Sequence, residues 1–223
     1  MRSSHAPAPP TTVPVADRAP RGVVRTLPIV RDDASLVEGL RSGEPWARAA
    51  LFDRYAPQVE RILRRILGND RHTEMADVIH DVFVQALASI DRLRDPSALL
   101  GWMQTIAAHT AYRTIRARRA RRWLCFWEPA NVPEVQVSDV DPEVSEACRR
   151  TYAVLDRLPA DERVAFALRF IDGMELAQVA AVCEVSLATI KRRLSRAEQR
   201  FAAAARRDEV LVKWLQEGDR WTT

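Results

Sequence analysis

Apolar residues recur at helical spacing along most of this chain, and no segment alternates between apolar and polar residues as a half-buried strand would. In the first half, the pattern predicts helices at 34–41, 45–55, 59–67, 73–89 and 97–122. Asp32 or Asp33 can cap the first of these. Pro45 suits the start of the second, because proline fits the first turn of a helix. Gly68 is expected to end the third.

The second half repeats the helical pattern in shorter segments. Prolines and turn residues separate predicted helices at 142–157 and 160–170, a pair of short helices within 175–201, and an amphipathic segment at 208–223. We expect that last segment to cap the domain, with partner binding as the alternative. Residues 1–30 are rich in proline and poor in large apolar groups, which predicts a disordered tail, or one that docks on a partner. The predicted fold is all-α, with two small helical domains joined by an extended acidic linker at 123–142.

The paired helices within 175–201 have the helix-turn-helix pattern. At about 100° per residue, the second helix carries apolar residues on one face and polar, mostly basic residues on the other. The apolar set is Ile190, Leu194, Ala197 and Phe201, and the polar set is Arg192, Ser195, Arg196 and Gln199. Ser186 can cap this helix, although the turn before it lacks the glycine that many such motifs use. The pattern predicts a helix that enters the DNA major groove; taken alone, it also fits a solvated surface helix.

The side chains expected to contact duplex DNA lie at the start and on the outward face of this helix. They are Ser186, Thr189, Lys191, Arg192, Ser195 and Arg196. Lysine and arginine can reach guanine O6 and N7 or a phosphate, and serine can bond to a base or to the backbone. Ser186 and Thr189 lie where a helix N-terminus can hold a phosphate.

Charge is distributed unevenly, although the formal net charge is only +4. Residues 99–124 contain no acidic side chain, and arginines crowd the second half of that segment, whereas residues 128–146 carry acids and no lysine or arginine. Like charges three and four residues apart destabilise a helix unless something neutralises them, so the basic segment predicts contact with a polyanion. Trp102 and Tyr112 lie among these residues and can stack on exposed bases, which suits single-stranded or melted nucleic acid. A core helix with a solvated basic end is the alternative.

Catalytic and metal-binding patterns are missing from the sequence. It contains no G-x-x-x-x-G-K, G-x-G-x-x-G, H-E-x-x-H or G-x-S-x-G motif. The histidines do not group with cysteines or carboxylates at metal spacing, and the cysteines Cys125, Cys148 and Cys183 form no C-x-x-C pair. We therefore expect no cofactor, no metal and no enzymatic activity. Scattered cysteines suit a reducing cytoplasm, and no apolar run approaches the roughly 20 residues that span a bilayer.

Five segments stand in a characteristic order: LFDRY at 51–55, ADVIHDVFVQA at 76–86, WMQTIA at 102–107, LPADER at 158–163, and the helix-turn-helix at 175–200. Each is loosely defined by itself, but their order and spacing resemble the extracytoplasmic-function (ECF) group of bacterial sigma factors in the sigma-70 family. The resemblance covers about residues 34–206. It implies a protein that binds core RNA polymerase and directs it to promoters.

The resemblance also implies roles for individual residues. The polymerase clamp would be contacted by Asp77, Val78, His80, Asp81, Val82 and Phe83. The melted −10 promoter element would be held by Trp102, His109, Tyr112, Arg113, Arg116, Arg118 and Arg119. The helix-turn-helix would bind the −35 element as duplex, and the acidic linker would run toward the active-site channel of the polymerase. An anti-sigma factor is implied as a further partner.

The sequence departs from the family pattern at several of these positions. His80 and Asp81 stand where the family commonly has Gln and Glu, and His109 and Arg113 stand where it commonly has Asn and Asp. The change to Arg113 reverses a charge, so the −10 base preference cannot be carried over. The implied organisation is a region 2-like domain at 31–122, the linker at 123–142, a region 4-like domain at 143–207 and an extension at 208–223. The competing hypothesis is a helix-turn-helix repressor or activator that binds duplex DNA without polymerase, and a nucleotide or RNA-modifying enzyme is the weaker third.

Overall fold

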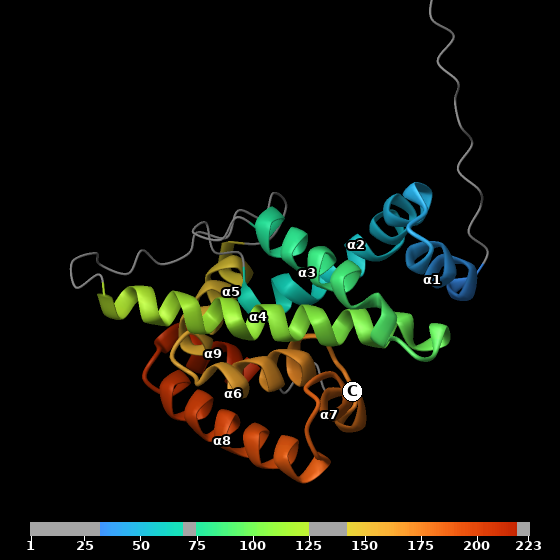
Figure 1. Ribbon diagram of the computed structural model, residues 1–223. Helices are drawn as coiled ribbons and strands as arrows, with labels where there is room; N and C mark the ends of the chain where they lie inside the picture. The colour runs from blue at the N-terminus through green and yellow to red at the C-terminus, as the bar shows by residue number, and fades with distance from the viewer. Residues whose placement is uncertain (1–31, 69–74, 125–141, 218–223) are drawn as a thin grey trace, which may run out of the picture.

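The chain is helical throughout the part that this computed structural model describes, residues 32–68, 75–124 and 142–217. The first domain contains α1 (Asp33–Arg41), α2 (Pro45–Leu67), α3 (Met75–Ser89) and α4 (Leu99–Leu124). The second contains α5 (Pro142–Leu155), α6 (Ala160–Phe166), α7 (Leu176–Val182), α8 (Leu187–Ala205) and α9 (Glu209–Glu217). Short 3-10 turns at Ile90–Arg92 and Pro96–Ala98 precede α4, and a π-helical turn, η3 (Ala167–Ile171), follows α6. The all-α prediction is confirmed for these residues (Figure 1). The expected N-terminal tail and nearly all of the expected linker lie outside them.

One break that the sequence predicts between two helices is absent from the structure. The segments predicted as separate helices at 45–55 and 59–67 form a single helix, α2, which continues through Pro57. Proline removes a backbone hydrogen bond inside a helix, but Pro57 is exposed, so water can satisfy the carbonyl that loses its partner. Tyr55 and Val59 on either side are buried in the same core. Packing along this face therefore outweighs the cost of the proline.

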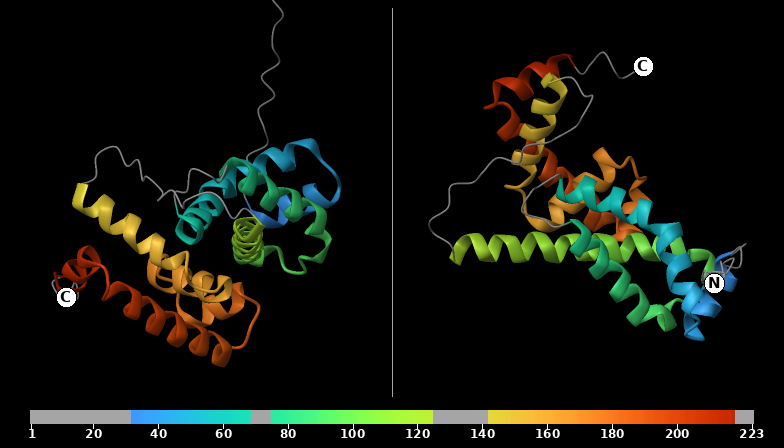
Figure 2. Two further views of the ribbon diagram at one scale, coloured as in Figure 1. Left: turned by 90° about the vertical axis from the view of Figure 1, so that its left-hand side faces the viewer. Right: turned by 90° about the horizontal axis from the view of Figure 1, so that it is seen from above.

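Helix α4 occupies the centre of the molecule. In Figure 1 it runs between α2 and α3 on one side and α6, α7 and α8 on the other, and the left view of Figure 2, in which α4 is seen end-on, shows the same order. Its buried residues cover a wide part of its circumference, from Leu99 and Met103 to Ala108 and Ile115. A helix that is buried over so much of its surface must pack on two sides at once. One side of α4 therefore belongs to the core of the first domain, and the other faces the second domain.

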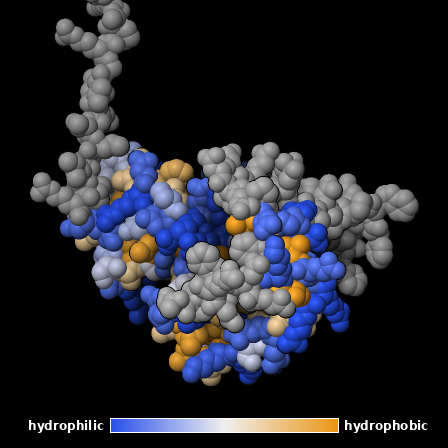
Figure 3. Space-filling model, turned by 180° about the vertical axis from the view of Figure 1, so that it is seen from behind, coloured by the Kyte–Doolittle hydropathy of each residue, from blue (hydrophilic) through white to orange (hydrophobic). Residues whose placement is uncertain are grey.

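The two domains share one contiguous buried cluster. It extends from Leu36 in α1 and Leu51 in α2 to Val164 in α6 and Ile190 in α8. Hydrophilic side chains predominate on the face seen in Figure 3, where the apolar ones form separate small patches. The shared buried cluster shows that the two domains pack against each other, although they are separate segments of the sequence.

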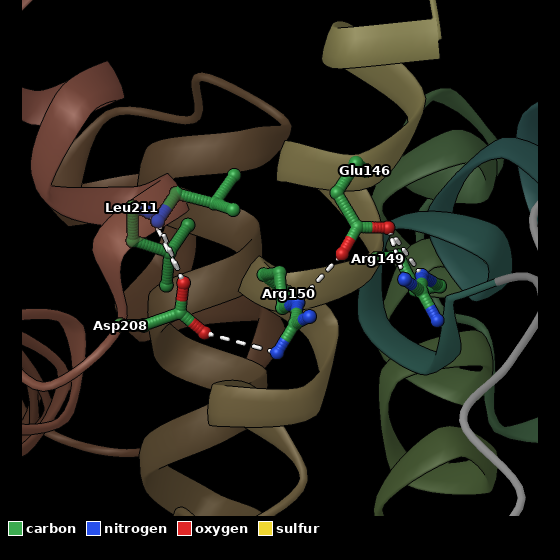
Figure 4. A network of polar contacts seen from close by, with 6 residues as sticks. Glu146, Arg149, Arg150, Asp208 and Leu211 are labelled. Atoms are coloured by element: carbon green, nitrogen blue, oxygen red, sulfur yellow. Dashed lines mark hydrogen bonds and ion pairs between the residues drawn. The ribbon is translucent and has the colours of Figure 1, made fainter.

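Helix α9 packs against α5 and the end of α8. Leu211 of α9 is buried with Val154 of α5 and Ala205 of α8. Asp208 accepts hydrogen bonds from the backbone N–H groups of Val210 and Leu211, at 3.1 and 3.3 Å, and so caps α9. The same carboxylate lies 3.5 Å from Arg150 of α5 (Figure 4). The described part of the C-terminal extension therefore covers the second domain, as the sequence pattern predicts.

Candidate nucleic-acid interface

The helix-turn-helix consists of α7, α8 and the turn Cys183–Glu184–Val185. Glu175 and Gln178 form a reciprocal capping box at the start of α7, in which the Glu175 N–H donates to Gln178 Oε1 at 3.0 Å. Glu184 adopts φ 52°, the left-handed conformation that glycine supplies in many such turns. The turn therefore has the left-handed backbone conformation that glycine usually adopts in this motif, but here the residue in that conformation is glutamate.

Ser186 begins α8 as its cap. Its Oγ accepts a hydrogen bond from the Thr189 N–H at 3.2 Å, and the two hydroxyl oxygens lie 2.9 Å apart. Capping by Ser186 is therefore confirmed. Because the two hydroxyls already bond to each other, a phosphate at this helix N-terminus would have to share or replace that bond.

The basic side chains of α8 divide into two groups according to the face on which they lie. Arg193 and Arg200 face the body of the domain and lie 3.2 and 3.5 Å from Asp161 and Glu162 of α6. The other group is exposed and, within the described residues, has no acidic partner. It consists of Lys191, Arg192 and Arg196, with the exposed Ser195 among them. An exposed cationic face without internal acid partners is available to phosphates and base edges.

The residues expected at the −10 element are arranged mainly along one strip of α4. At helical spacing, Trp102, His109, Tyr112, Arg113 and Arg116 fall on the side away from the buried residues Met103 and Ala107. Tyr112 and Arg116 are in contact: the guanidinium carbon lies 5.8 Å from the ring centroid. The structure thus gathers five of the seven expected −10 residues on a single strip.

Arg118 and Arg119 lie off this strip. Arg118 is half-buried on another side of α4. The guanidinium of Arg119 donates to the backbone carbonyls of Asp156, at 2.9 Å, and of Leu158, in the connection between α5 and α6. Their expected phosphate contacts therefore stay untested predictions, and in this conformation Arg119 is held by the second domain.

His109 also faces the second domain. Its Nε2 lies 3.5 Å from the carboxylate of Glu184 in the helix-turn-helix turn. With Tyr112 and Arg113 it lines a cleft of about 450 Å³ whose opposite wall includes Asp161, Cys183 and Arg193. Burial raises the pKa of the Cys183 thiol to about 11, so the thiol stays protonated at neutral pH. Protonated, it offers a small core side chain rather than a metal ligand, and the described residues contain no group of His, Cys, Asp and Glu suited to a metal ion.

Helix α3 separates the expected polymerase contacts into two layers. Asp77, His80 and Asp81 are exposed and share one face. Val78, Val82 and Phe83 are buried in the core, with Val82 at 0% exposure. In this conformation the second group supports the exposed face from beneath and offers little surface to a partner.

Two exposed apolar residues lie next to this face, and the sequence pattern did not single them out. Val84 extends the row of Asp77 and Asp81 along α3 and is 49% exposed. Phe52 of α2 is 48% exposed, and its ring centroid lies 4.9 Å from that of Phe83. Their sequence positions belong to segments quoted for the family resemblance, but only the burial of each residue distinguishes surface from support.

Comparison with known proteins agrees with this layout. Residues 51–121 match the family described as Sigma-70 region 2, and residues 148–201 match Sigma-70, region 4. The ECF RNA polymerase sigma-E factor of Haemophilus influenzae is 30% identical over 176 residues, covering 75% of this chain and 92% of that protein. The chain belongs to the ECF group of the sigma-70 family.

Further proteins similar to this ECF sigma factor support the same family assignment. The ECF RNA polymerase sigma-E factor of Escherichia coli K12 is 26% identical over 181 residues, covering 75% of this chain and 91% of that protein. Among solved structures, CnrH in complex with the cytosolic domain of CnrY has a TM-score of 0.54 at 24% identity, covering 79% of this chain and 99% of that one. The sigma factor RpoE of Bartonella quintana, in complex with the anti-sigma factor NepR, has a TM-score of 0.51 at 23% identity, covering 72% and 98%. These two similarities show the fold. None of the helices in the described part of the chain combines the length and the apolar character that crossing a bilayer requires.

Proposed function

We propose that this ECF sigma factor binds core RNA polymerase and directs it to promoters by recognising a −35 element as duplex and a −10 element as melted strand. One observation carries the proposal. A basic strip on α4, part of which lines the cleft against the second domain, and an exposed basic face on α8 lie on helices that fall in the two matched sigma regions. A repressor that binds duplex DNA alone has no need of the first surface, because stacking aromatics and cations suit an unpaired strand.

The −35 element would be read by α8. Lys191, Arg192 and Arg196 are exposed and lack acidic partners within the described residues, so they can bond to guanine edges and phosphates without first breaking an ion pair. Ser195 adds a short polar contact on the same face. Ser186 and Thr189 would contact phosphates at the helix start.

The −10 element would be held by the strip on α4. Trp102 and the contacting pair Tyr112 and Arg116 offer flat surfaces for bases, and Arg113 offers positive charge to the phosphates. His109 and Arg113 replace the residue types common in the family, so the base preference here should be this protein's own. Arg118 and Arg119 would join the phosphate contacts once the second domain no longer holds Arg119.

The polymerase clamp would dock on the exposed face of α3. Asp77, His80 and Asp81 provide its polar part, and we add Val84 and Phe52 as its apolar part. Val78, Val82 and Phe83 keep that face in shape. An anti-sigma factor is a further expected partner, because RpoE, which has this fold, forms a complex with the anti-sigma factor NepR, and CnrH forms one with the cytosolic domain of CnrY. We place the action in the cytoplasm, as an initiation factor with no enzymatic activity of its own.

Transcription in vitro with purified core polymerase and a library of promoter sequences tests this proposal. The expected result is initiation that depends on this protein and selects templates with a shared pair of elements about 25 base pairs apart, as their names state. A protein that shifts duplex DNA alone but never stimulates initiation would instead be a repressor or activator. Arg207→Ala is a control variant that should leave initiation unchanged, since this exposed arginine lies beyond α8 and outside both proposed surfaces.

A further inference from the structure

The first residue of α8, Leu187, is a large apolar side chain that the core does not hold. It is 43% exposed and belongs neither to the buried clusters of the described residues nor to the apolar residues packed against them. Its neighbours in sequence are held, because Val185 packs against the largest cluster and Ile190 is part of it. A single exposed leucine is ordinary on a protein surface. What distinguishes Leu187 is its place on the helix.

The other exposed large apolar side chains of the described residues lie outside α8. Phe52 and Phe170 each contact a second aromatic ring, with centroids 4.9 and 4.8 Å apart. Val84 adjoins the face proposed for the polymerase clamp. Leu187 is the one that belongs to the helix whose outward face is basic. Folding therefore leaves this leucine exposed beside the surface proposed to read duplex DNA.

Leu187 stands at the leading end of that surface. It follows the cap Ser186 directly and precedes the exposed Lys191 by one turn, and residues four apart are neighbours on a helix surface. Side chains on a helix tilt toward its N-terminus, so that of Leu187 extends toward the start of α8. Ala188 beside it is exposed but offers only a methyl group, so it does not screen the leucine.

The charge around Leu187 indicates which partner covers it. The exposed cations Lys191 and Arg192 lie within the next turn, and they favour a polyanion over an apolar protein surface. Helix α8 also lies along the outer edge of the molecule, where a duplex can approach it (Figure 1). In the helix-turn-helix geometry, the N-terminal residues of the second helix contact base edges in the major groove. Leu187 is therefore expected to face bases.

One base offers an apolar group in the major groove. Thymine presents its C5-methyl group there, whereas the edges of guanine, cytosine and adenine present hydrogen-bond donors and acceptors. A leucine side chain can bond to none of those polar groups, and a polar group that is buried without a partner costs free energy. Thymine is thus the base whose edge matches Leu187.

We propose that Leu187 is a specificity-determining residue that contacts the 5-methyl group of a thymine in the −35 element. The proposal rests on the promoter recognition proposed above and adds a base that α8 selects. Four residues of a helix span about 6 Å, and successive base pairs lie about 3.4 Å apart. The thymine should therefore lie within about two base pairs of the position that Lys191 contacts.

Replacement of single thymines in the −35 element by 2′-deoxyuridine tests this contact, because deoxyuridine lacks only the 5-methyl group. The duplex is the −35 element that the promoter library selects, and fluorescence anisotropy measures its binding by full-length protein on core polymerase. At one thymine, removal of the methyl group should reduce affinity about fivefold, the order expected for one buried methyl group.

Variants of Leu187 connect that effect to the side chain. Leu187→Ala should bind the thymine duplex at least about fivefold more weakly, and it should bind the thymine and deoxyuridine duplexes equally. Leu187→Met keeps a long apolar side chain and should retain most of the methyl effect. Leu100→Ala is the matched control, because it removes a leucine of similar exposure, 41%, from α4 and should leave the methyl effect unchanged. Circular dichroism should show the same helix content in all of them.

Two results would overturn the contact. One is a −35 element in which no thymine loses affinity with its methyl group. The other is a methyl effect of the same size in Leu187→Ala as in the unsubstituted protein, which would assign the leucine to the shape of the helix start. A protein that never stimulates initiation, or selects no shared −35 element, would instead overturn the proposed function, and the contact with it. That outcome is distinct from initiation without a methyl effect.

Discussion

The imidazole Nε2 of His109 lies 3.5 Å from the carboxylate of Glu184, so the α4 helix meets the turn of the helix-turn-helix at this pair. Both residues depart from the sequence patterns of their motifs. His109 stands where the family commonly has asparagine, and Glu184 occupies the left-handed position that glycine often fills. The tertiary structure brings the two departures together. Both side chains are largely exposed, at 48 and 65%, so the pair itself contributes little to stability.

Glu184→Gly should therefore stabilise the protein. Glutamate in the left-handed region costs about 1–2 kcal/mol, and glycine loses about 0.5–1 kcal/mol of that gain to its greater freedom in the unfolded chain. The expected net gain is about 0.5–1 kcal/mol in the free energy of unfolding, measured by urea denaturation. Glu184→Ala is the control, since it removes the same carboxylate but keeps the strain. Equal stability of the two variants would show that the backbone conformation carries no cost.

Arg196→Ala should weaken sequence-specific binding by this protein. The side chain is exposed on the outward face of α8 and lacks an acidic partner within the described residues. Its loss should cost about 1–3 kcal/mol on the cognate −35 duplex and less on scrambled DNA. Fluorescence anisotropy at fixed salt, with the polymerase-bound protein, measures both. Arg206→Ala, at the far end of the same helix, should change neither. Equal losses on cognate and scrambled DNA would assign Arg196 to phosphate contact alone.

Adjacent residues on α3 should have separable effects. Asp81→Arg reverses an exposed charge and should reduce affinity for core polymerase at least tenfold while leaving the melting temperature nearly unchanged. Val82→Ala opens a cavity under a side chain with 0% exposure and should cost on the order of 1–3 kcal/mol of stability. Thermal unfolding and a polymerase pull-down titration distinguish the two. A large loss of stability in Asp81→Arg would contradict the assignment of that residue to the surface.

Stability near α5 should depend on pH through Glu146. Hydrogen bonds from Arg149, and then from Arg150, lower the pKa of this carboxyl from its ordinary value of 4.5 (Figure 4). A carboxyl with a lowered folded-state pKa stabilises the fold at pH above the unfolded value, and the contribution disappears as pH falls through the folded value. Glu146→Gln should therefore be less stable at pH 7 by about 0.2–1 kcal/mol, the range for exposed ion pairs.

At pH 3, the difference between the urea midpoints of unfolding of Glu146→Gln and the unsubstituted protein should be smaller than at pH 7. Glu143→Gln is the matched control, because it removes another carboxylate near the start of α5 that is more exposed than Glu146, 69 against 29%, and whose contact with the exposed Lys213 of α9 is longer, at 3.5 Å. A difference between Glu146→Gln and the unsubstituted protein that did not depend on pH would exclude the carboxylate as its source.

Local pattern was sufficient for most of the secondary structure of the described residues. The 3.6-residue period identified the buried face of α8, because Ile190, Leu194 and Ala197 are buried wherever this helix packs on a core. The family resemblance assigned both Asp81 and Val82 to the polymerase contact, because one motif contains the exposed residue and the buried residue that supports it. The predicted break at Pro57 was wrong. The cost of one lost backbone hydrogen bond is local, whereas the packing of Tyr55 and Val59 that compensates for it depends on residues distant in sequence.

The sequence by itself determined that this protein is all-α, that it carries basic surfaces in two regions, and that its segments follow the order of an ECF sigma factor. Those properties reside in neighbouring residues and in the order of motifs. Only the tertiary structure decided that the two domains close on α4, that Arg163 caps α2, and that Arg119 is held by the second domain rather than free for a phosphate. Such contacts join residues roughly 40 to 100 positions apart, and their partners are backbone carbonyls, which every residue has. No sequence pattern can therefore mark them in advance.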